Sequence, residues 1–81
     1  MIKNDLKKCV VKALENNNRK AKIVDICRFI WINYENELCK SGDLFYTWQY
    51  DVRWAGTKLR KDGIMKSAEE QVNGYWELTD T

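Results

Sequence analysis

The residues best suited to chemistry lie in one stretch, 43–63, which reads DLFYTWQYDVRWAGTKLRKDG. At about 100° per residue, its apolar residues fall in one sector of a helix. These are Leu44, Phe45, Trp48, Val52, Ala55, Gly56 and Leu59. The opposite sector holds hydroxyls, aromatic rings and cations, namely Tyr46, Thr47, Tyr50, Arg53, Trp54, Thr57, Lys58 and Lys61. A helix that serves only a core does not need this set, so the second sector predicts a contact surface for a partner.

Several of these side chains are suited to reading a nucleic acid. Arg53 can form a bidentate pair with guanine O6 and N7, and Gln49 can do the same for adenine if the helix is rolled toward it. Tyr46, Thr47 and Tyr50 can donate to phosphate or pack on a thymine methyl group, and Thr57 lies in the same sector. The alternative for each is an ordinary solvated side chain.

Lysines outside this sector suit phosphate neutralisation that does not depend on base sequence. The candidates, together with Lys58 from the sector itself, are Lys40, Lys20, Lys22 and Lys66. Net charge is only +2, but it is segregated. Residues 1–28 carry eight basic and three acidic side chains, and residues 52–66 are also basic, whereas 29–51 and 67–81 are acidic. A nearly neutral domain with such patterning can still attract a polyanion, although ordinary solvated helix faces explain the charges equally well.

Catalytic chemistry has little support in the sequence. There is no histidine, hence no ordinary triad, and no Gly-rich phosphate loop or nuclease-like cluster of two acids and a lysine stands out. The three cysteines are odd in number and widely spaced, which indicates neither a disulfide framework nor a zinc finger. Cys9 and Cys27 are expected to be buried and Cys39 to lie in a polar loop. We expect no enzyme activity, metal or cofactor, although the chain could be the recognition domain of a larger nuclease.

The length of 81 residues predicts a single domain, 1–81, with a modest core. Four tryptophans and four tyrosines indicate an ordered globular domain. No apolar run approaches the roughly 20 residues that span a bilayer, and the N-terminus lacks the apolar core of a secretory signal. We therefore expect a soluble, cytoplasmic protein without a membrane partner.

The first half of the chain predicts two helices. In 3–16, apolar residues recur at helical spacing, and the three asparagines 16–18 end the segment. Residues 19–22 form an extended link or an edge strand. The second helix, 23–34, leaves Phe29, Trp31 and Ile32 partly on its outer side. Either neighbouring elements cover these three side chains, or they form a dimer or partner interface.

The second half predicts a helix followed by a hairpin. A polar connector, 35–42, leads to the helix of 43–63, which Asp43 or Thr47 can cap and which ends at Gly63. Residues 64–67 and 74–79, joined by a tip at 68–73, form a two-stranded β-hairpin. The predicted fold class is α+β, a winged helix-turn-helix of three helices with a C-terminal hairpin as the wing.

Residues 48–79 add a family resemblance. The pattern Trp48-x-x-x-Val52-Arg53-Trp54-Ala55-x-x-x-Leu59-Arg60-Lys61-x-Gly63-Ile64, then Gly74-x-Trp76-x-Leu78-Thr79, resembles the N-terminal winged-helix domain of Mrr-type restriction endonucleases. Ile23-x-Asp25-Ile26 is similar to the second helix of that family. The resemblance implies a domain that reads DNA, often modified DNA, and delivers a separate nuclease domain to it.

The chain departs from the family pattern in two places. Asp51 stands where a basic residue is usual, and Glu69 and Glu70 make the wing tip acidic, both of which weaken the case for phosphate contacts there. Trp54 matches the pattern but faces away from the apolar sector. It is expected either to pack against the wing or the second helix, or to stack on a base.

The sequence supports two hypotheses on function. The first is a winged-helix domain that binds double-stranded DNA in a restriction or regulatory system, with a fused or separate nuclease domain as a further partner. The second is a winged-helix module for protein interaction or homodimerisation without DNA binding, which Phe29, Trp31, Ile32, Trp54 and the acidic tip favour.

Overall fold

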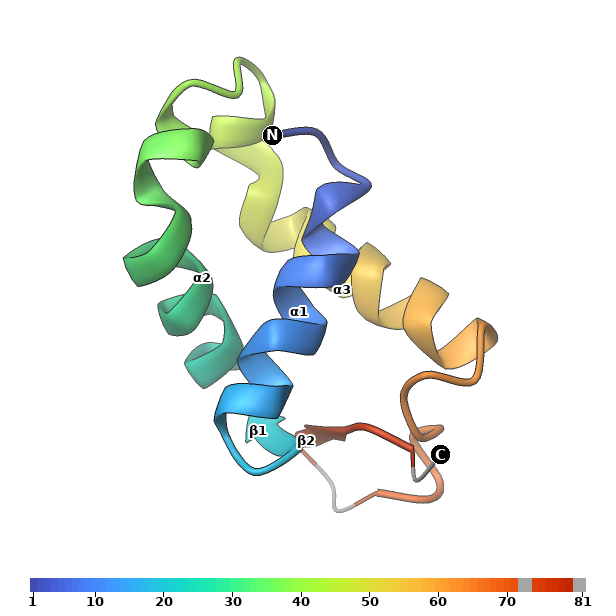
Figure 1. Cartoon of the computed structure of the whole chain (residues 1–81). Helices are drawn as coiled ribbons and strands as arrows, with labels where there is room; N and C mark the ends of the chain where they lie inside the picture. Colours follow the sequence, from blue (N-terminus) through green and yellow to red (C-terminus); the bar gives the residue numbers. More distant parts are fainter. Residues whose placement is uncertain (72–73, 80–81) are drawn as a thin grey trace.

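Three helices and a small antiparallel sheet make up the computed structural model, which describes residues 1–71 and 74–79. The elements occur in the order α1 (Asp5–Asn16), β1 (Lys20–Lys22), α2 (Ile23–Cys39), α3 (Leu44–Lys61) and β2 (Tyr75–Glu77). Each helix packs against the other two, and the sheet closes one end of the helical layer (Figure 1). The fold class is therefore α+β, as predicted.

Helix α1 has the periodicity that the sequence predicted. Its inward residues are Leu6, Cys9, Val10, Ala13 and Leu14, all buried as expected. The asparagine run ends it, because Asn18 and Arg19 both adopt positive φ angles of 61° and 70°. Asparagine tolerates this left-handed conformation better than most residues. The chain then reverses into β1, which confirms the predicted edge strand.

Helix α2 is longer than predicted. It continues past Tyr34, where the backbone leaves helical geometry (φ −128°, ψ 18°), and ends at Cys39. The expected polar connector 35–42 is therefore wrong in its first five residues. Polar composition indicated a loop, but the kink turns the last turn of α2 so that Leu38 becomes fully buried. Only residues 40–43 separate α2 from α3.

Helix α3 ends as the sequence indicated but begins differently. Gly63 has φ +76°, Gly63 N–H donates to the Arg60 carbonyl (3.1 Å), and Ile64 N–H donates to the Leu59 carbonyl (2.9 Å). These two bonds form a Schellman motif, for which glycine is favoured. The predicted side-chain cap is absent, because Asp43 occupies the N-cap position without a capping hydrogen bond and Thr47 donates to Asp51 instead.

The C-terminal hairpin is only partly as predicted. Its first arm, expected at 64–67, is not a strand and joins the second arm through one bridge, Met65 to Leu78, with a flanking hydrogen bond from Lys66 N–H to the Glu77 carbonyl (2.8 Å). The ladder instead joins β2 to β1, with Ala21 opposite Trp76. The predicted tip, 68–73, extends beyond the described residues at 72–73. Local spacing indicated the hairpin, whereas the inward packing of Trp76 placed β2 beside β1.

Trp76 connects the sheet to α3. An ideal Cβ on Gly56 would lie 2.5 Å from Cη2 of Trp76, so the indole occupies the space that any larger residue would fill. The guanidinium carbon of Arg60, one turn later, lies 5.6 Å from the centre of the same ring. Gly56 therefore belongs to the buried side of α3, as predicted. The Trp76 ring occupies the space beside its Cα that a side chain would otherwise fill.

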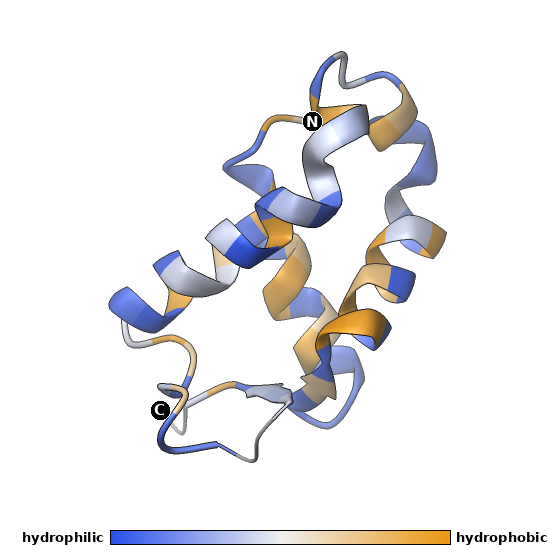
Figure 2. Cartoon of the chain, turned by 180° about the vertical axis from the view of Figure 1, so that it is seen from behind, coloured by the Kyte–Doolittle hydropathy of each residue, from blue (hydrophilic) through white to orange (hydrophobic). Residues whose placement is uncertain are grey.

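The core lies between the three helices. Its largest fully buried side chains are Leu6, Leu14, Ile26, Ile30, Leu38, Met65, Val10 and Val52. Figure 2 shows α3 from its solvent side, where polar residues predominate, and α2 with a longer hydrophobic run. In the described part of the chain, no helix has the length and apolar character needed to cross a membrane.

Replacing Gly56 with alanine is expected to destabilise the fold by roughly 1–3 kcal/mol, because the new methyl group would overpack against Trp76. Urea unfolding measures the change. In a Trp76→Leu background the same substitution should become neutral or stabilising, since alanine has the higher helix propensity by about 1 kcal/mol. Equal costs in both backgrounds would contradict the proposed contact.

Candidate nucleic-acid interface

The outward row of α3 consists of Tyr46, Tyr50, Arg53 and Thr57. All four side chains are exposed, and the two tyrosine residues retain 83% and 76% of their accessible surface. The opposite side carries Leu44, Trp48, Val52, Ala55 and Leu59 into the core. The predicted separation of the two sectors is thus confirmed for most residues, but Phe45 of the apolar sector and Trp54 and Lys58 of the outward sector are half-buried. Arg53 remains open to solvent on the side that the sequence indicated.

A shallow groove runs beside this row, between α2 and α3. One hollow of about 350 Å³ is lined by Ile23, Val24, Cys27, Gln49, Tyr50 and Arg53. A second, of about 280 Å³, is lined by Trp31, Phe45, Trp48 and Gln49. Because Gln49 lines both, the two hollows adjoin. Gln49 therefore projects on the α2 side of the row, one turn before Arg53, where both side chains face the same opening.

The floor of the groove is aromatic. Trp31 of α2 stacks on Trp48 of α3 with ring centres 6.1 Å apart and planes within 9° of parallel. Trp48 is buried, whereas Trp31 is partly exposed. Neighbouring elements thus cover one part of the apolar surface predicted on α2: Phe29 packs against the core, while Ile32 remains open. Sequence reasoning missed the groove because it depends on how α2 crosses α3.

Asp51 does not face the outward row. It is 8% exposed, accepts a hydrogen bond from the Thr47 hydroxyl (2.8 Å), and lies 4.0 Å from the Lys3 ammonium. Asp51, the acid that departs from the family pattern, therefore adds no exposed carboxylate to the outward row. The hydrogen bond to Asp51 occupies the single hydroxyl proton of Thr47. Thr47 therefore cannot donate to Asp51 and to a phosphate at the same time.

Trp54 contacts the N-terminal segment of the chain. The Lys3 ammonium lies 4.5 Å from the centre of its ring, a cation–π contact, and the indole is half-buried against the core. The contact with Lys3 was not among the arrangements that the sequence predicted for Trp54. Lys3 contacts Asp51 and Trp54 together, which connects the N-terminal segment to the middle of α3.

The candidate phosphate-binding lysines form two separate groups. Lys20 and Lys22 extend from β1 over the Tyr75 ring, at 5.5 and 5.8 Å from its centre, and Lys66 pairs with Glu77 at 3.0 Å. Lys40 lies beyond the far end of α2, about 25 Å away along a 17-residue helix. Lys58 is half-buried in the last turn of α3. The structure thus brings three lysines together on the sheet and leaves Lys40 apart from them.

The turn after the first hairpin arm is acidic. Glu69 and Glu70 are exposed, and the Glu70 carboxylate accepts hydrogen bonds from the hydroxyl (2.9 Å) and the N–H (3.3 Å) of Ser67. These bonds lower the pKa of Glu70 below its ordinary value of 4.5. The carboxylate accordingly stays ionised at neutral pH, and this turn is unsuited to a phosphate contact.

The burial of the cysteines is as expected for Cys9 but not for Cys27. Cys9 is buried, Cys27 half-buried in the α2–α3 groove, and Cys39 exposed at the end of α2 rather than in a loop. Burial raises the pKa of both the Cys9 and the Cys27 thiol above the ordinary 9.0. Among the described residues, no group of three His, Cys, Asp or Glu side chains could hold a metal ion.

The sequence matches no protein-family model, and searches of curated proteins and of solved structures give no match either. The similarity of residues 48–79 to the N-terminal domain of Mrr-type endonucleases therefore remains a resemblance between patterns. Inferences about function accordingly rest on the geometry of α3 and its surroundings.

Replacing Asp51 with alanine is expected to cost about 1–2 kcal/mol of stability, because Thr47 loses a charged acceptor and Lys3 its counter-ion. Asp43→Ala is the matched control. This acid stands at the N-cap of the same helix but makes no capping bond, so its loss should cost less than about 0.5 kcal/mol. Urea unfolding distinguishes the two, and a larger loss at Asp43 would contradict the observed network.

Thiol labelling of the native protein is expected to proceed in the order Cys39, Cys27, Cys9. Iodoacetamide reacts with the thiolate, and the raised pKa of Cys9 and Cys27 lowers their thiolate fraction at any given pH below or near 9. Mass spectrometry of peptides after timed labelling measures the order. Urea should abolish the difference, and rapid native labelling of Cys9 would contradict its burial.

Proposed function

We propose that this chain is a winged helix-turn-helix domain that binds double-stranded DNA through the outward row of α3. The order of elements supports the proposal, because two helices separated by four residues are followed by a C-terminal arm that pairs in an antiparallel sheet. In helix-turn-helix proteins the second helix of the pair enters the major groove, and its N-terminal residues contact base edges. Here that helix is α3.

One observation carries the proposal. The outward row offers two phenols, a hydroxyl and a guanidinium to solvent and includes no carboxylate, because Asp51, the single acid within α3, is buried on another side. A surface with this composition attracts a polyanion and provides donors for it. The acidic residues nearest to the two ends, Asp43 and Asp62, lie outside the helix.

The side chains of the row have distinct roles in the proposed complex. Arg53 reads guanine O6 and N7, and Gln49, which shares the groove with it, reads adenine. Tyr46 and Tyr50 donate to phosphates or pack on thymine methyl groups. Thr57 already donates to the Arg53 carbonyl at 3.2 Å, and its hydroxyl is exposed for an exchange of partners.

Phosphate contacts flank the row. Lys20, Lys22 and Lys66 lie on the sheet at one end of α2, Lys40 at the other end, and Lys58 in the last turn of α3. A duplex major groove about 12 Å wide has a phosphate backbone on each side. The separation of Lys40 from the sheet lysines is consistent with contacts to both backbones. The Lys66–Glu77 pair reduces the net charge that the sheet contributes.

The proposed chemistry is recognition without catalysis. If the resemblance to Mrr-type endonucleases extends to function, the domain delivers a nuclease domain to DNA and cuts nothing itself. A protein-interaction module remains the second candidate. The specific observation in its favour is the exposed Ile32, which retains 69% of its accessible surface on the outer side of α2.

Arg53→Ala is expected to weaken duplex binding by roughly 5- to 150-fold at a preferred site, which corresponds to about 1–3 kcal/mol for one bidentate base contact. Arg53→Lys should retain non-specific binding and lose base preference, since lysine keeps the charge without the planar fork. Fluorescence anisotropy at several salt concentrations measures both. Lys8→Ala, which removes an exposed cation from α1, is the matched control and should change affinity little.

No duplex binding at low salt would rule out the DNA-binding function. Equal effects of Lys8→Ala and Arg53→Ala would show that charge alone matters and remove Arg53 from the base-reading role. The slope of log affinity against log salt should stay unchanged in Arg53→Lys.

A further inference from the structure

The outer side of α2 carries an apolar row that nothing in the described chain covers. Val24, Arg28, Ile32 and Glu35 succeed one another at spacings of four, four and three residues, and all are exposed. Ile32 and Val24 retain 69% and 55% of their accessible surface. Val24 also lines the α2–α3 groove, and Trp31 lies beside them at its edge. Figure 2 shows the hydrophobic character of this helix. Val24 and Ile32, two exposed β-branched residues that each lie one turn from Arg28, form a seam typical of a helix that pairs with another helix.

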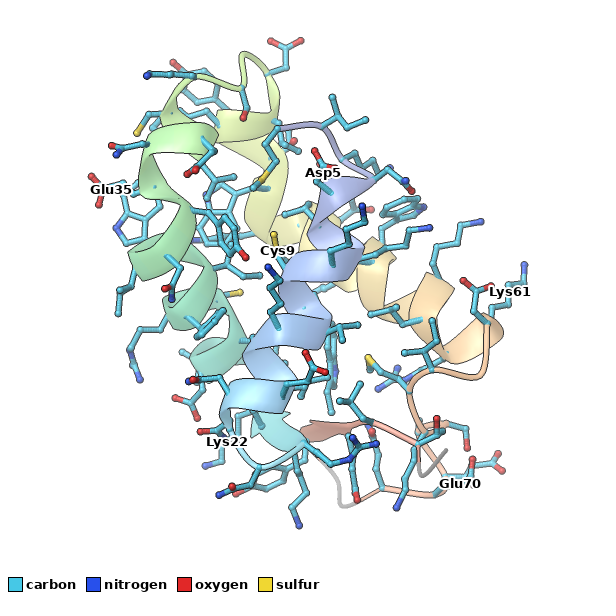
Figure 3. The ribbon with its side chains drawn as sticks, in the orientation of Figure 1. Asp5, Cys9, Lys22, Glu35, Lys61 and Glu70 are labelled. Atoms are coloured by element: carbon cyan, nitrogen blue, oxygen red, sulfur yellow. The ribbon has the colours of Figure 1, made fainter. Side chains whose placement is uncertain are left out.

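The charges at the ends of the seam have opposite sign. Lys20 and Lys22 are exposed where α2 begins, and Glu35 and Glu37 are exposed near its end. Lys22 and Glu35 lie at opposite ends of the helix (Figure 3). At the centre, Arg28 pairs with Asp25 at 2.9 Å, so the middle of the seam is neutral. The surface therefore has two lysines at one end, is apolar and neutral in the middle, and has Glu35 at the other end, where Glu37 lines a hollow beside α1 and Lys40 follows the last residue of the helix.

We propose that α2 is the interface of a symmetric homodimer in which the two copies of α2 run antiparallel. With the two-fold axis near Arg28, Val24 of one copy packs on Ile32 of the second, and Glu35 lies opposite the segment that carries Lys20 and Lys22. The same patch serves both copies, as a two-fold interface requires. Each end then pairs with its opposite charge, and the two helix dipoles are antiparallel.

The distribution of charge favours a second, antiparallel copy of α2 as the partner of this surface. A parallel arrangement would place lysine against lysine and glutamate against glutamate. A second apolar surface, a groove between α1 and α3 lined by Val11, Leu59 and Ile64, carries charges of both signs, since Lys7, Lys8, Lys12, Glu15 and Asp62 also line it. Of its apolar side chains only Ile64 is exposed, at 42%, which is less than Val24 or Ile32 on α2. One helical face is smaller than the roughly 800 Å² per partner of a standard interface, so the dimer is weak and depends on concentration.

The first test measures self-association in variants in which isoleucines at different places on the surface are replaced by lysine. In sedimentation equilibrium of the full chain without DNA, the wild type should associate with a dissociation constant on the order of micromolar to submillimolar. Ile32→Lys should weaken association at least tenfold. Ile2→Lys changes an equally exposed isoleucine, at 66%, near the N-terminus, and Ile64→Lys changes the α1–α3 groove; both should leave association unchanged.

The second test fixes the direction of the helices. Lys22→Glu and Glu35→Lys should each weaken the dimer, and the double variant should restore it. The restored pair must form between copies, because 13 residues of helix separate the two positions by about 20 Å within one chain. Lys61→Glu combined with Glu35→Lys should not restore association, since Lys61 lies at the end of α3.

Several outcomes would overturn the proposal. A monomer at every concentration up to about 1 mM excludes the dimer. Loss of association in Ile64→Lys, with Ile32→Lys unaffected, places the interface at α1 and α3. Failure of the double charge variant to recover excludes the antiparallel arrangement. None of these measurements includes DNA, so they are independent of the proposed DNA-binding function.

Discussion

The position of Trp76 against Gly56 is the contact on which the arrangement of the sheet and α3 depends. Trp76 belongs to β2, whose only ladder partner in the described chain is β1, so one indole ring fixes both strands relative to α3. Arg60 covers the ring from the next turn of the helix. The ring occupies the flank of α3 at Gly56 and Arg60, away from the outward row of Tyr46, Tyr50, Arg53 and Thr57, which stays exposed.

A second contact holds the other half of the same helix. Lys3 lies against both Asp51 and Trp54, and Thr47 donates to Asp51 within α3. The outward row thus projects from a helix that the N-terminal segment contacts at its middle and the sheet near its C-terminal end. In the proposed complex, a surface held in this way loses little conformational freedom on binding, which favours affinity. The acid that was expected to disfavour DNA is therefore part of the support.

Helix α2 connects the two proposals. One side of it forms the groove beside Gln49 and Arg53, and its outer side carries the row centred on Arg28. Lys22 takes part in both proposed interfaces, since it can neutralise a phosphate of DNA or pair with Glu35 of a second copy. Electrostatic pairing of this kind is screened by salt, so DNA binding and self-association would respond to ionic strength in the same direction. The two would also compete for the lysines of β1.

The sequence by itself determined the elements whose signal is local. Helical periodicity placed the inward residues of α1 and α3, the asparagine run and Gly63 marked the ends of these helices, and Arg53 was assigned to the exposed side. These features depend on side-chain spacing and on backbone preferences within a few residues, which a linear pattern records. The same patterns identified Lys20, Lys22 and Lys40 as exposed cations without indicating their mutual distance.

Tertiary structure alone determined where α2 ends, which strand pairs with β2 and which residues contact Asp51. Polar residues after Tyr34 indicated a loop, but the burial of Leu38 stabilised another turn of helix. The spacing of the C-terminal residues indicated a local hairpin, but Trp76 gained more by packing on α3, which paired β2 with β1. Asp51 was expected on the surface, whereas Thr47 and Lys3 are its partners. In each case a contact between residues distant in sequence, or across a helical turn, outweighed a local preference worth about 1 kcal/mol or less.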